Sequence, residues 1–154
     1  MKFDAFRQPQ VPEVGEASFA SFVAAMLGEF AEAVPASRRR GFYVAVGRRL
    51  AATETLDGVD DTAALVGRVN AFWQAKGWGR AEISLDRDAI IVHHRHPPAP
   101  PAGTPVGLWT GMLIAVLEGA YDSWFQRLGS GPTLHTSAEW KGDSVELRHG
   151  RQQA

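Results

Sequence analysis

The chain has 154 residues, of which 45% are hydrophobic and 21% charged, and its formal net charge at pH 7 is −1. This length and composition predict one globular domain with one core, and the near balance of charge gives no indication of binding to nucleic acid or to an anionic membrane. The absence of cysteine excludes disulfides and thiolate chemistry.

Pro9 and Pro12 interrupt residues 1–14, which we expect to form an extended arm. No apolar run of signal-peptide length precedes Pro9, so no export signal of the usual kind is predicted and a cytoplasmic location is expected. The longest uncharged apolar run, residues 106–117, is far shorter than the roughly 20 residues that span a bilayer. We therefore expect a protein that does not span a membrane.

Helical periodicity marks the next part of the chain. From Glu16 until Pro35, apolar residues recur at the i, i+3, i+4 spacing of an amphipathic helix. These residues are Phe19, Phe22, Val23, Met26, Leu27, Phe30 and Val34. Ser37 is a candidate N-cap for a second helix that ends near Thr55. The apolar residues of this second helix are Phe42, Tyr43, Val46 and Leu50.

A third helix is predicted from the capping cluster Asp60-Asp61-Thr62 to Gly77. Its apolar residues are Leu65, Val66, Val69, Phe72 and Trp73. Gly77 stands where a left-handed residue just beyond the helix is needed, and Trp78 is expected to fold back over the last turn.

Beyond Gly77 the apolar period changes from that of a helix to that of a strand. Ala81, Ile83 and Leu85 alternate with polar residues, and the turn at 86–88 leads into a second strand at 89–94, which predicts a hairpin. The proline-rich stretch 97–105 cannot form a ladder, so we expect a stiff, exposed connector of polyproline type.

A long apolar helix is predicted from Gly107 to near Gly129, followed by two strands at 133–140 and 144–149. Two hairpins most simply build one four-stranded antiparallel sheet with helices packed on a face, so the expected fold class is α+β. The expected organisation is an extended arm at 1–14, a single α+β domain at 15–150 and a flexible tail at 151–154.

His93, His94 and His96 are the obvious candidates for a metal site. On a continuous strand His94 and His96 would share one face and His93 would lie on the other, so only two could converge. No metalloenzyme spacing is present, and a strand end that runs into a polar loop is the favoured interpretation. We predict no metal and no other cofactor, and keep a histidine metal enzyme as the third hypothesis.

Glu118 and Asp122 are spaced i, i+4 and share a helix face, where they could form an acid–base pair. Glu118 interrupts an apolar stretch, and a carboxylate there requires a partner or a boundary, so pairing with an arginine is favoured over catalysis. No phosphate loop, nucleophile elbow or Ser/His/Asp constellation is recognisable. We therefore predict no catalytic residue and no enzyme activity.

Two features of the helices suggest contact with other proteins. The arginines at 38–40 and 48–49 form a basic helical face, for which partner contact or plain solvation is favoured over nucleic acid. The long helix combines small residues at intervals of four with large aromatic residues, a pattern that allows close helix approach and supplies contact area. The alternative is a core helix wrapped by the first three helices, and both can hold on different faces. The candidate oligomer-interface residues are Trp109, Gly111, Ala115, Gly119, Tyr121 and Trp124.

Several motifs occur in a distinctive order. They are Gly77-Trp78-Gly79, a strand ending Ile91-Val92-His93, the proline-rich linker, Gly107-Leu108-Trp109, and a Leu-Glu-Gly-x-Tyr-x-x-Trp helix at 117–124. In this order and spacing they resemble the family of the bacterial cellulose synthase D subunit (BcsD). The resemblance covers roughly residues 65–128, whereas the first sixty residues match only as a helical pattern and the last hairpin only in type.

The resemblance implies a non-catalytic accessory protein of cellulose biosynthesis. Members of the family assemble as dimers that build a ring-like octamer, which helps to organise synthase complexes or their glucan chains into ordered fibrils. The implied partners are further copies of the chain and other cellulose synthase subunits, with a β-1,4-glucan chain as a further candidate.

The N-terminal segments line the inner passages of the family's ring, but residues 1–14 do not match them residue by residue. Independently of the family, Lys2, Phe3, Asp4 and Phe6 are candidates for glucan binding by stacking and hydrogen bonding, with a disordered arm as the alternative. The second hypothesis for the whole chain is a small-molecule or lipid-binding α+β module whose apolar helix lines a pocket.

Overall fold

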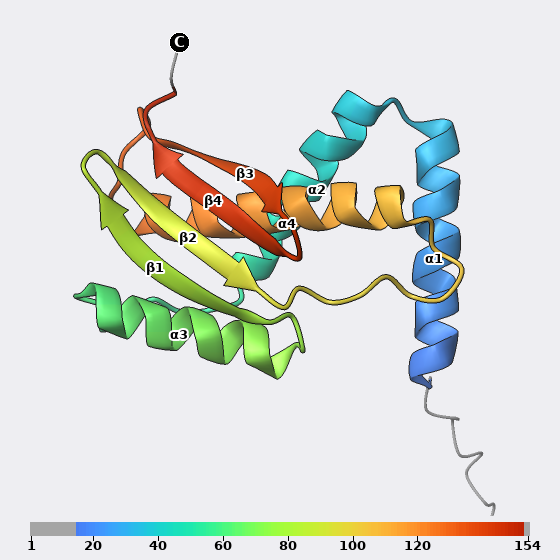
Figure 1. The fold of residues 1–154 in the computed structure, drawn as a ribbon, viewed down its shortest axis with the longest axis horizontal. Coiled ribbons are helices and arrows are strands. Elements are labelled where there is room, and N and C mark those ends of the chain that lie inside the picture. The colour runs from blue at the N-terminus through green and yellow to red at the C-terminus, as the bar shows by residue number, and fades with distance from the viewer. Residues whose placement is uncertain (1–14, 153–154) are drawn as a thin grey trace, which may run out of the picture.

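The computed structural model describes residues 15–152, and it confirms the α+β fold class. In these residues four helices accompany a four-stranded antiparallel sheet (Figure 1). The expected arm at 1–14 and the last two residues lie outside the described residues. The elements are α1 (Glu16–Ala33), α2 (Ala36–Ala51), α3 (Thr62–Ala75), β1 (Arg80–Asp86), β2 (Ala89–Arg95), α4 (Val106–Arg127), β3 (His135–Lys141) and β4 (Ser144–Gly150).

The two hairpins join through their second strands, which gives the sheet order β1-β2-β4-β3. Val92 of β2 lies opposite Leu147 of β4 in the centre of the sheet, and both side chains are fully buried. The inner face of the sheet packs on α4, and β1 packs on α3 along one edge (Figure 1). The core therefore lies between the sheet and these two helices.

The third helix has the boundaries and the caps that its sequence predicts. The Asp61 carboxylate accepts a hydrogen bond from the backbone N–H of Ala64 at 2.7 Å, and Gly77 has a φ of 66°. The backbone N–H of Trp78 donates to the Trp73 carbonyl at 2.9 Å, a hydrogen bond that ends the helix around the left-handed Gly77. The Trp78 ring folds back and stacks on Trp73 with ring centroids 5.6 Å apart.

The second helix differs from its prediction at both ends. It begins at Ala36 with Pro35 in the N-cap position, so Ser37 already lies inside the first turn and is not the cap. It ends at Ala51 and not near Thr55. The Ala51 carbonyl accepts hydrogen bonds from the Trp124 indole and the Arg127 guanidinium of α4, at 3.2 and 3.0 Å. Side chains distant in sequence thus bind the last carbonyl of α2.

The proline-rich connector is partly packed onto the domain, and the expectation of a fully exposed segment is wrong. The Trp109 indole donates a hydrogen bond to the Pro98 carbonyl at 2.8 Å, and Thr104 is buried. This tryptophan of α4 holds the connector down, because its buried N–H requires an acceptor.

Helices α2 and α4 run side by side and meet through their backbones. A Cβ added to Gly119 would clash with the Val44 carbonyl group and come within 2.8 Å of its carbon, and a Cβ on Gly47 would come within 2.9 Å of the Ala120 nitrogen. Only glycine at these two positions allows so close an approach. The two glycines therefore set the spacing of the helix pair.

Helix α1 stands apart from the rest of the fold (Figure 1). Leu27 is its buried anchor, whereas Phe19, Phe22 and Met26 are 61%, 63% and 51% exposed. Most of the apolar surface of α1 therefore remains open in the single chain.

Replacing Gly119 by Ala should destabilise the fold strongly, because the methyl group meets backbone atoms that cannot move aside without separating the two helices. We expect a loss of about 3 kcal/mol in the free energy of unfolding, measured by urea titration. The control is Gly111→Ala on the same helix, where a Cβ meets nothing within 4 Å. This change should gain up to about 1 kcal/mol from helix propensity. Equal effects of the two changes would contradict the backbone contact.

Candidate functional site

The residues expected at an oligomer interface lie mostly inside the chain. Gly111 is exposed, while the other five are buried. Helix α4 is thus covered by the sheet, α3 and α2 of its own chain. The candidate glucan-binding residues Lys2, Phe3, Asp4 and Phe6 fall outside the described residues. The five buried residues are Trp109, Ala115, Gly119, Tyr121 and Trp124.

A network of buried hydrogen bonds centres on the Tyr121 hydroxyl. The Trp73 indole N–H donates to this oxygen at 3.1 Å, and the hydroxyl lies 2.9 Å from His94 Nδ1. On the other side of the ring, His94 Nε2 lies 2.7 Å from the Trp78 carbonyl, which can only accept. His94 therefore carries its proton on Nε2, and its Nδ1 accepts a hydrogen bond from the Tyr121 hydroxyl. Every polar side-chain atom of this network is satisfied by one set of donors and acceptors.

Burial keeps both titrating groups of this network neutral. Removal from water lowers the pKa of His94 to about 4, against the opposing effect of its bond to the Trp78 carbonyl. Burial likewise raises the pKa of Tyr121 far above its usual range, opposed by the hydrogen bond from Trp73. Neither group is available as an acid or base near neutral pH, so the network has a structural role.

The other two histidines of the predicted candidate metal site, His93 and His96, do not lie with His94 in one site. His93 points to the outer face of the sheet, where its Nδ1 lies 3.8 Å from the Glu146 carboxylate. His96 lies beyond the end of β2 with a φ of 56°, so the expectation that it shares a strand face with His94 is wrong. Within residues 15–152, no group of three or more potential ligands could hold a metal ion.

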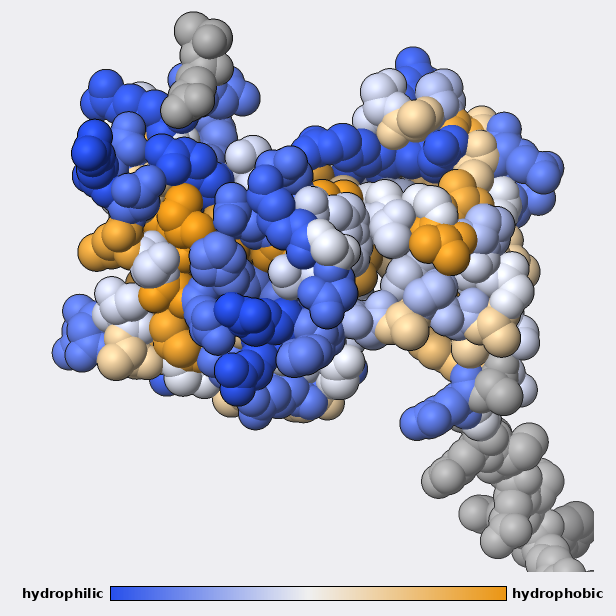
Figure 2. All heavy atoms as spheres, in the orientation of Figure 1, coloured by the Kyte–Doolittle hydropathy of each residue, from blue (hydrophilic) through white to orange (hydrophobic). Residues whose placement is uncertain are grey.

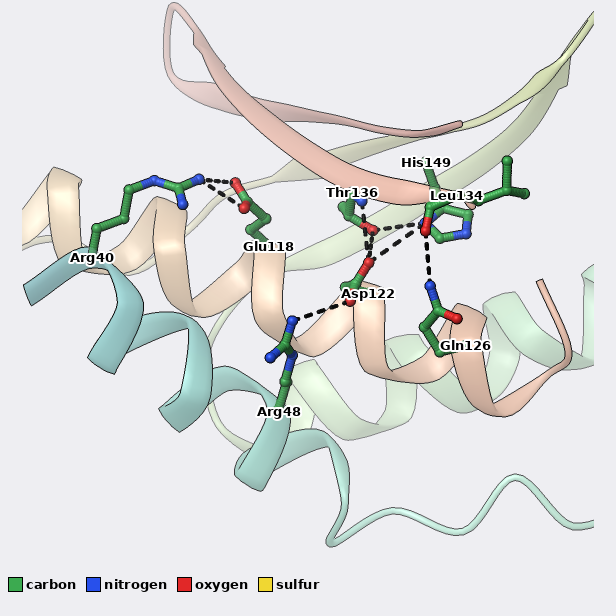
Figure 3. Close-up of polar contacts among 8 residues, drawn as sticks. All are labelled: Arg40, Arg48, Glu118, Asp122, Gln126, Leu134, Thr136 and His149. Carbon is green, nitrogen blue, oxygen red and sulfur yellow. Dashed lines mark hydrogen bonds and ion pairs between the residues drawn. The ribbon is translucent and has the colours of Figure 1, made fainter. Parts of the chain in front are cut away.

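The predicted pairing of Glu118 with an arginine is confirmed. The guanidinium of Arg40 donates to both carboxylate oxygens of Glu118, at 2.7 and 2.6 Å (Figure 3). The carboxylate is largely covered while the arginine is more than half exposed. The pair therefore closes the seam between α2 and α4 at the surface.

Asp122 lies one turn further along α4 and ties the helix to β3. One carboxylate oxygen accepts hydrogen bonds from the Thr136 backbone N–H and hydroxyl, both at 3.1 Å, and the other lies 3.5 Å from Arg48 (Figure 3). The Thr136 oxygen lies 2.8 Å from His149 Nδ1. Because the Thr136 hydroxyl donates its hydrogen bond to Asp122, its oxygen accepts a hydrogen bond from His149 Nδ1.

The Asp122–Thr136–His149 arrangement is not that of a nucleophilic triad. There the histidine takes the hydroxyl proton, whereas here His149 donates to the hydroxyl. Burial lowers the pKa of His149, opposed by the nearby charge of Asp122. Its Nε2 is buried without a hydrogen-bond partner in the described part of the chain, so a second proton there would have no acceptor. These groups join α4 to the hairpin β3–β4 and lack the geometry for acyl transfer.

Four of the seven exposed large hydrophobic side chains in residues 15–152 lie on α1 and α2, and we call this surface the α1–α2 face. Phe42 of α2 is 54% exposed and its ring lies 5.0 Å from Phe30 of α1. Figure 2 shows hydrophobic residues over the upper part of α1, and over the sheet it shows hydrophobic residues among hydrophilic ones. A groove of about 620 Å³ separates α1 from the domain, and a second apolar hollow of about 430 Å³ lies between α1 and α2. The exposed apolar side chains of the face are Phe19, Phe22, Met26 and Phe42.

The periodicity of α1 placed these residues on a helix but did not distinguish exposed from buried positions. The apolar surface of α1 is wider than a single buried stripe, because Phe19, Phe22 and Met26 are exposed while Leu27 is buried. That excess width was the available signal for a second contact surface. No helix in residues 15–152 has the length and apolarity to cross a membrane.

Comparison with protein families agrees with the motif resemblance. The family model for the D subunit of cellulose synthase matches residues 9–150. The match includes α1 and α2, where the motifs gave no residue-level likeness. Among curated proteins no relative matches the chain. Two of these motifs meet in the structure, since Trp78 and Tyr121 share the buried hydrogen-bond network with His94.

The free energy of unfolding should fall as the pH is lowered from 6.5 toward 4. The folded chain keeps His94 neutral to a pKa of about 4, whereas the unfolded chain takes up the proton near 6.5. Stability is at its full value above pH 6.5 and is lost progressively below it, and the loss amounts to about 3 kcal/mol at pH 4. Urea titrations at several pH values measure the loss of stability, and NMR titration of the His94 imidazole shows whether this residue causes it.

The control is His93→Gln, which removes a histidine from the outer face of the sheet and should leave the same dependence. An imidazole of His94 that titrates near 6.5 in the folded protein would contradict the buried network.

Proposed function

Because the chain belongs to the family of the cellulose synthase D subunit, we propose that it is a non-catalytic scaffold of bacterial cellulose synthesis that acts by self-association. Within residues 15–152 no group of three or more potential ligands could hold a metal ion, and the Asp122–Thr136–His149 arrangement is not that of a nucleophilic triad. The scaffold would organise synthase complexes, or the glucan chains that they make, into ordered fibrils.

The observation that carries this proposal is the α1–α2 face. A soluble single chain rarely exposes several large apolar side chains together, and such a patch usually marks a protein contact. Phe19, Phe22 and Met26 project from a helix that one buried leucine anchors to the domain. Coverage by another protein chain would remove them from water.

The finer parts of the proposal follow the resemblance. We propose that dimers of the chain build a ring-like octamer, that other cellulose synthase subunits bind this assembly, and that it acts in the cytoplasm. The exposed side of α4 at Gly111 is available for a contact between dimers, because a Cβ there meets nothing within 4 Å. Glucan contact is assigned to Lys2, Phe3, Asp4 and Phe6.

A second candidate function is binding of a small apolar molecule or lipid. The groove between α1 and the domain favours it, because its lining is mostly apolar and includes Trp78, Trp109 and Met112. Native mass spectrometry separates the two candidates. A co-purifying ligand of defined mass on a monomer supports binding, and a ligand-free oligomer supports the scaffold.

The full chain should elute as a species several times its 16.7 kDa mass in size-exclusion chromatography with light scattering at micromolar concentration. Phe22→Gln should shift this mass toward the monomer, because it places a polar group in the centre of the α1–α2 face. Leu85→Gln is the matched control, since Leu85 is 75% exposed on β1, away from that face. A wild-type monomer would remove the scaffold proposal.

The same variants connect self-association to cellulose in living cells. In a cellulose-producing bacterium that lacks its own BcsD, the wild-type chain and Leu85→Gln should restore ordered fibrils, measured by X-ray diffraction of the cellulose. Phe22→Gln should restore less order at equal protein level. Full restoration by Phe22→Gln would separate the function from the α1–α2 face.

A further inference from the structure

Two exposed stripes run along the α1–α2 face. On α1, Phe19, Phe22, Met26 and Glu29 follow one another at spacings of three and four residues, and all are exposed. The corresponding stripe on α2 has the same spacing and is also exposed. It consists of Arg38, Phe42, Ala45 and Arg49. Each stripe thus combines apolar side chains with charge, acidic on α1 and basic on α2.

The two helices carry opposite charge throughout. Helix α1 contains three glutamates and no lysine or arginine, and α2 contains five arginines and no aspartate or glutamate. Among residues 15–152, no ion pair involves Glu29, Arg38 or Arg49. The charges at the edges of the face are therefore not neutralised by ion pairs within the described chain.

We infer that the α1–α2 face is a self-complementary surface on which α1 of one copy packs against α2 of a second copy. A twofold axis makes this contact twice, because each copy offers one acidic and one basic stripe. Contact of α1 with α1 would place glutamates together, and contact of α2 with α2 would place arginines together, both of which cost free energy. The inference rests on the proposed function, because it specifies the surface by which the scaffold self-associates.

The exposed apolar area matches the apolar centre of such a contact, which charged residues at the rim then enlarge. At roughly 200 Å² for each large side chain, the four exposed apolar residues leave on the order of 450 Å² open. A stable interface covers about 800 Å² on each partner, with a polar rim around an apolar centre. The apolar side chains supply the centre, and Glu29, Arg38 and Arg49 supply charged residues for the rim. The hollow between α1 and α2 gives a second copy a concave surface to fill.

The test reverses charge on one stripe at a time. Glu29→Lys places a cation against the arginines of the second copy, and the pair Arg38→Glu with Arg49→Glu places anions against its glutamates. Each of these two proteins should form dimers roughly tenfold or more weakly than the wild type, measured by analytical ultracentrifugation at about 50 mM salt. An equimolar mixture of them should recover wild-type affinity, because both contacts in the mixed dimer then pair opposite charges.

Matched controls use charged positions away from the stripes. Asp143→Lys lies in the turn of the second hairpin and Arg87→Glu in the turn of the first, both away from α1 and α2, so both should leave association unchanged. Circular dichroism verifies that every variant folds.

The outcomes separate the inference from the proposed function. A wild-type oligomer with two weakened single proteins and a recovered mixture supports the inference. A wild-type oligomer that the reversals leave unchanged, or a mixture that fails to recover, overturns the α1-to-α2 pairing and leaves the scaffold standing. A wild-type monomer overturns the proposed function itself. The α1–α2 face would then be covered by residues 1–14 or by another protein.

Discussion

The Tyr121 hydroxyl is the point on which the domain depends. It accepts a hydrogen bond from the Trp73 indole of α3 and donates one to His94 of β2, and His94 in turn donates to the Trp78 carbonyl in the loop between α3 and β1. Because these atoms are buried, an alternative packing would leave at least one of them without a partner, at a cost of about 1–3 kcal/mol each. The sheet, α3 and α4 are thereby held in one arrangement around an otherwise apolar core.

The same arrangement decides which surface is left for other proteins. Helix α4 is covered by the sheet, by α3 and by α2, and the backbone contact at Gly47 and Gly119 leaves no room for another helix on the α2 side. A helix apolar on nearly all sides needs such cover. The aromatic residues of α4 are buried in the chain's own core, while Phe19 and Phe22 of α1 and Phe42 of α2 stay exposed. In the proposed scaffold, self-association therefore uses the outer helices α1 and α2, whose apolar stripes also carry opposite charges.

The local features of the sequence predicted much of the fold. The order of helices and strands, the cap at Asp61 and the left-handed Gly77 follow from short-range chemistry, and the structure has all of them. The pairing of Glu118 with an arginine was also predictable, but the choice of Arg40 was not, because it depends on how α2 packs on α4. The end of α2 at Ala51 and the packed connector depend on Trp124, Arg127 and Trp109 of α4. Such distant donors leave no local signal.

We propose that α4 belongs to the core of one chain and that the α1–α2 face forms the contact between copies. Amide hydrogen exchange read by mass spectrometry tests it directly, on the wild-type oligomer and on dissociated Phe22→Gln. We expect peptides from α1 and α2 to exchange faster in the variant, while those from α4 stay equally protected in both. Loss of protection in α4, with α1 and α2 unchanged, would contradict it.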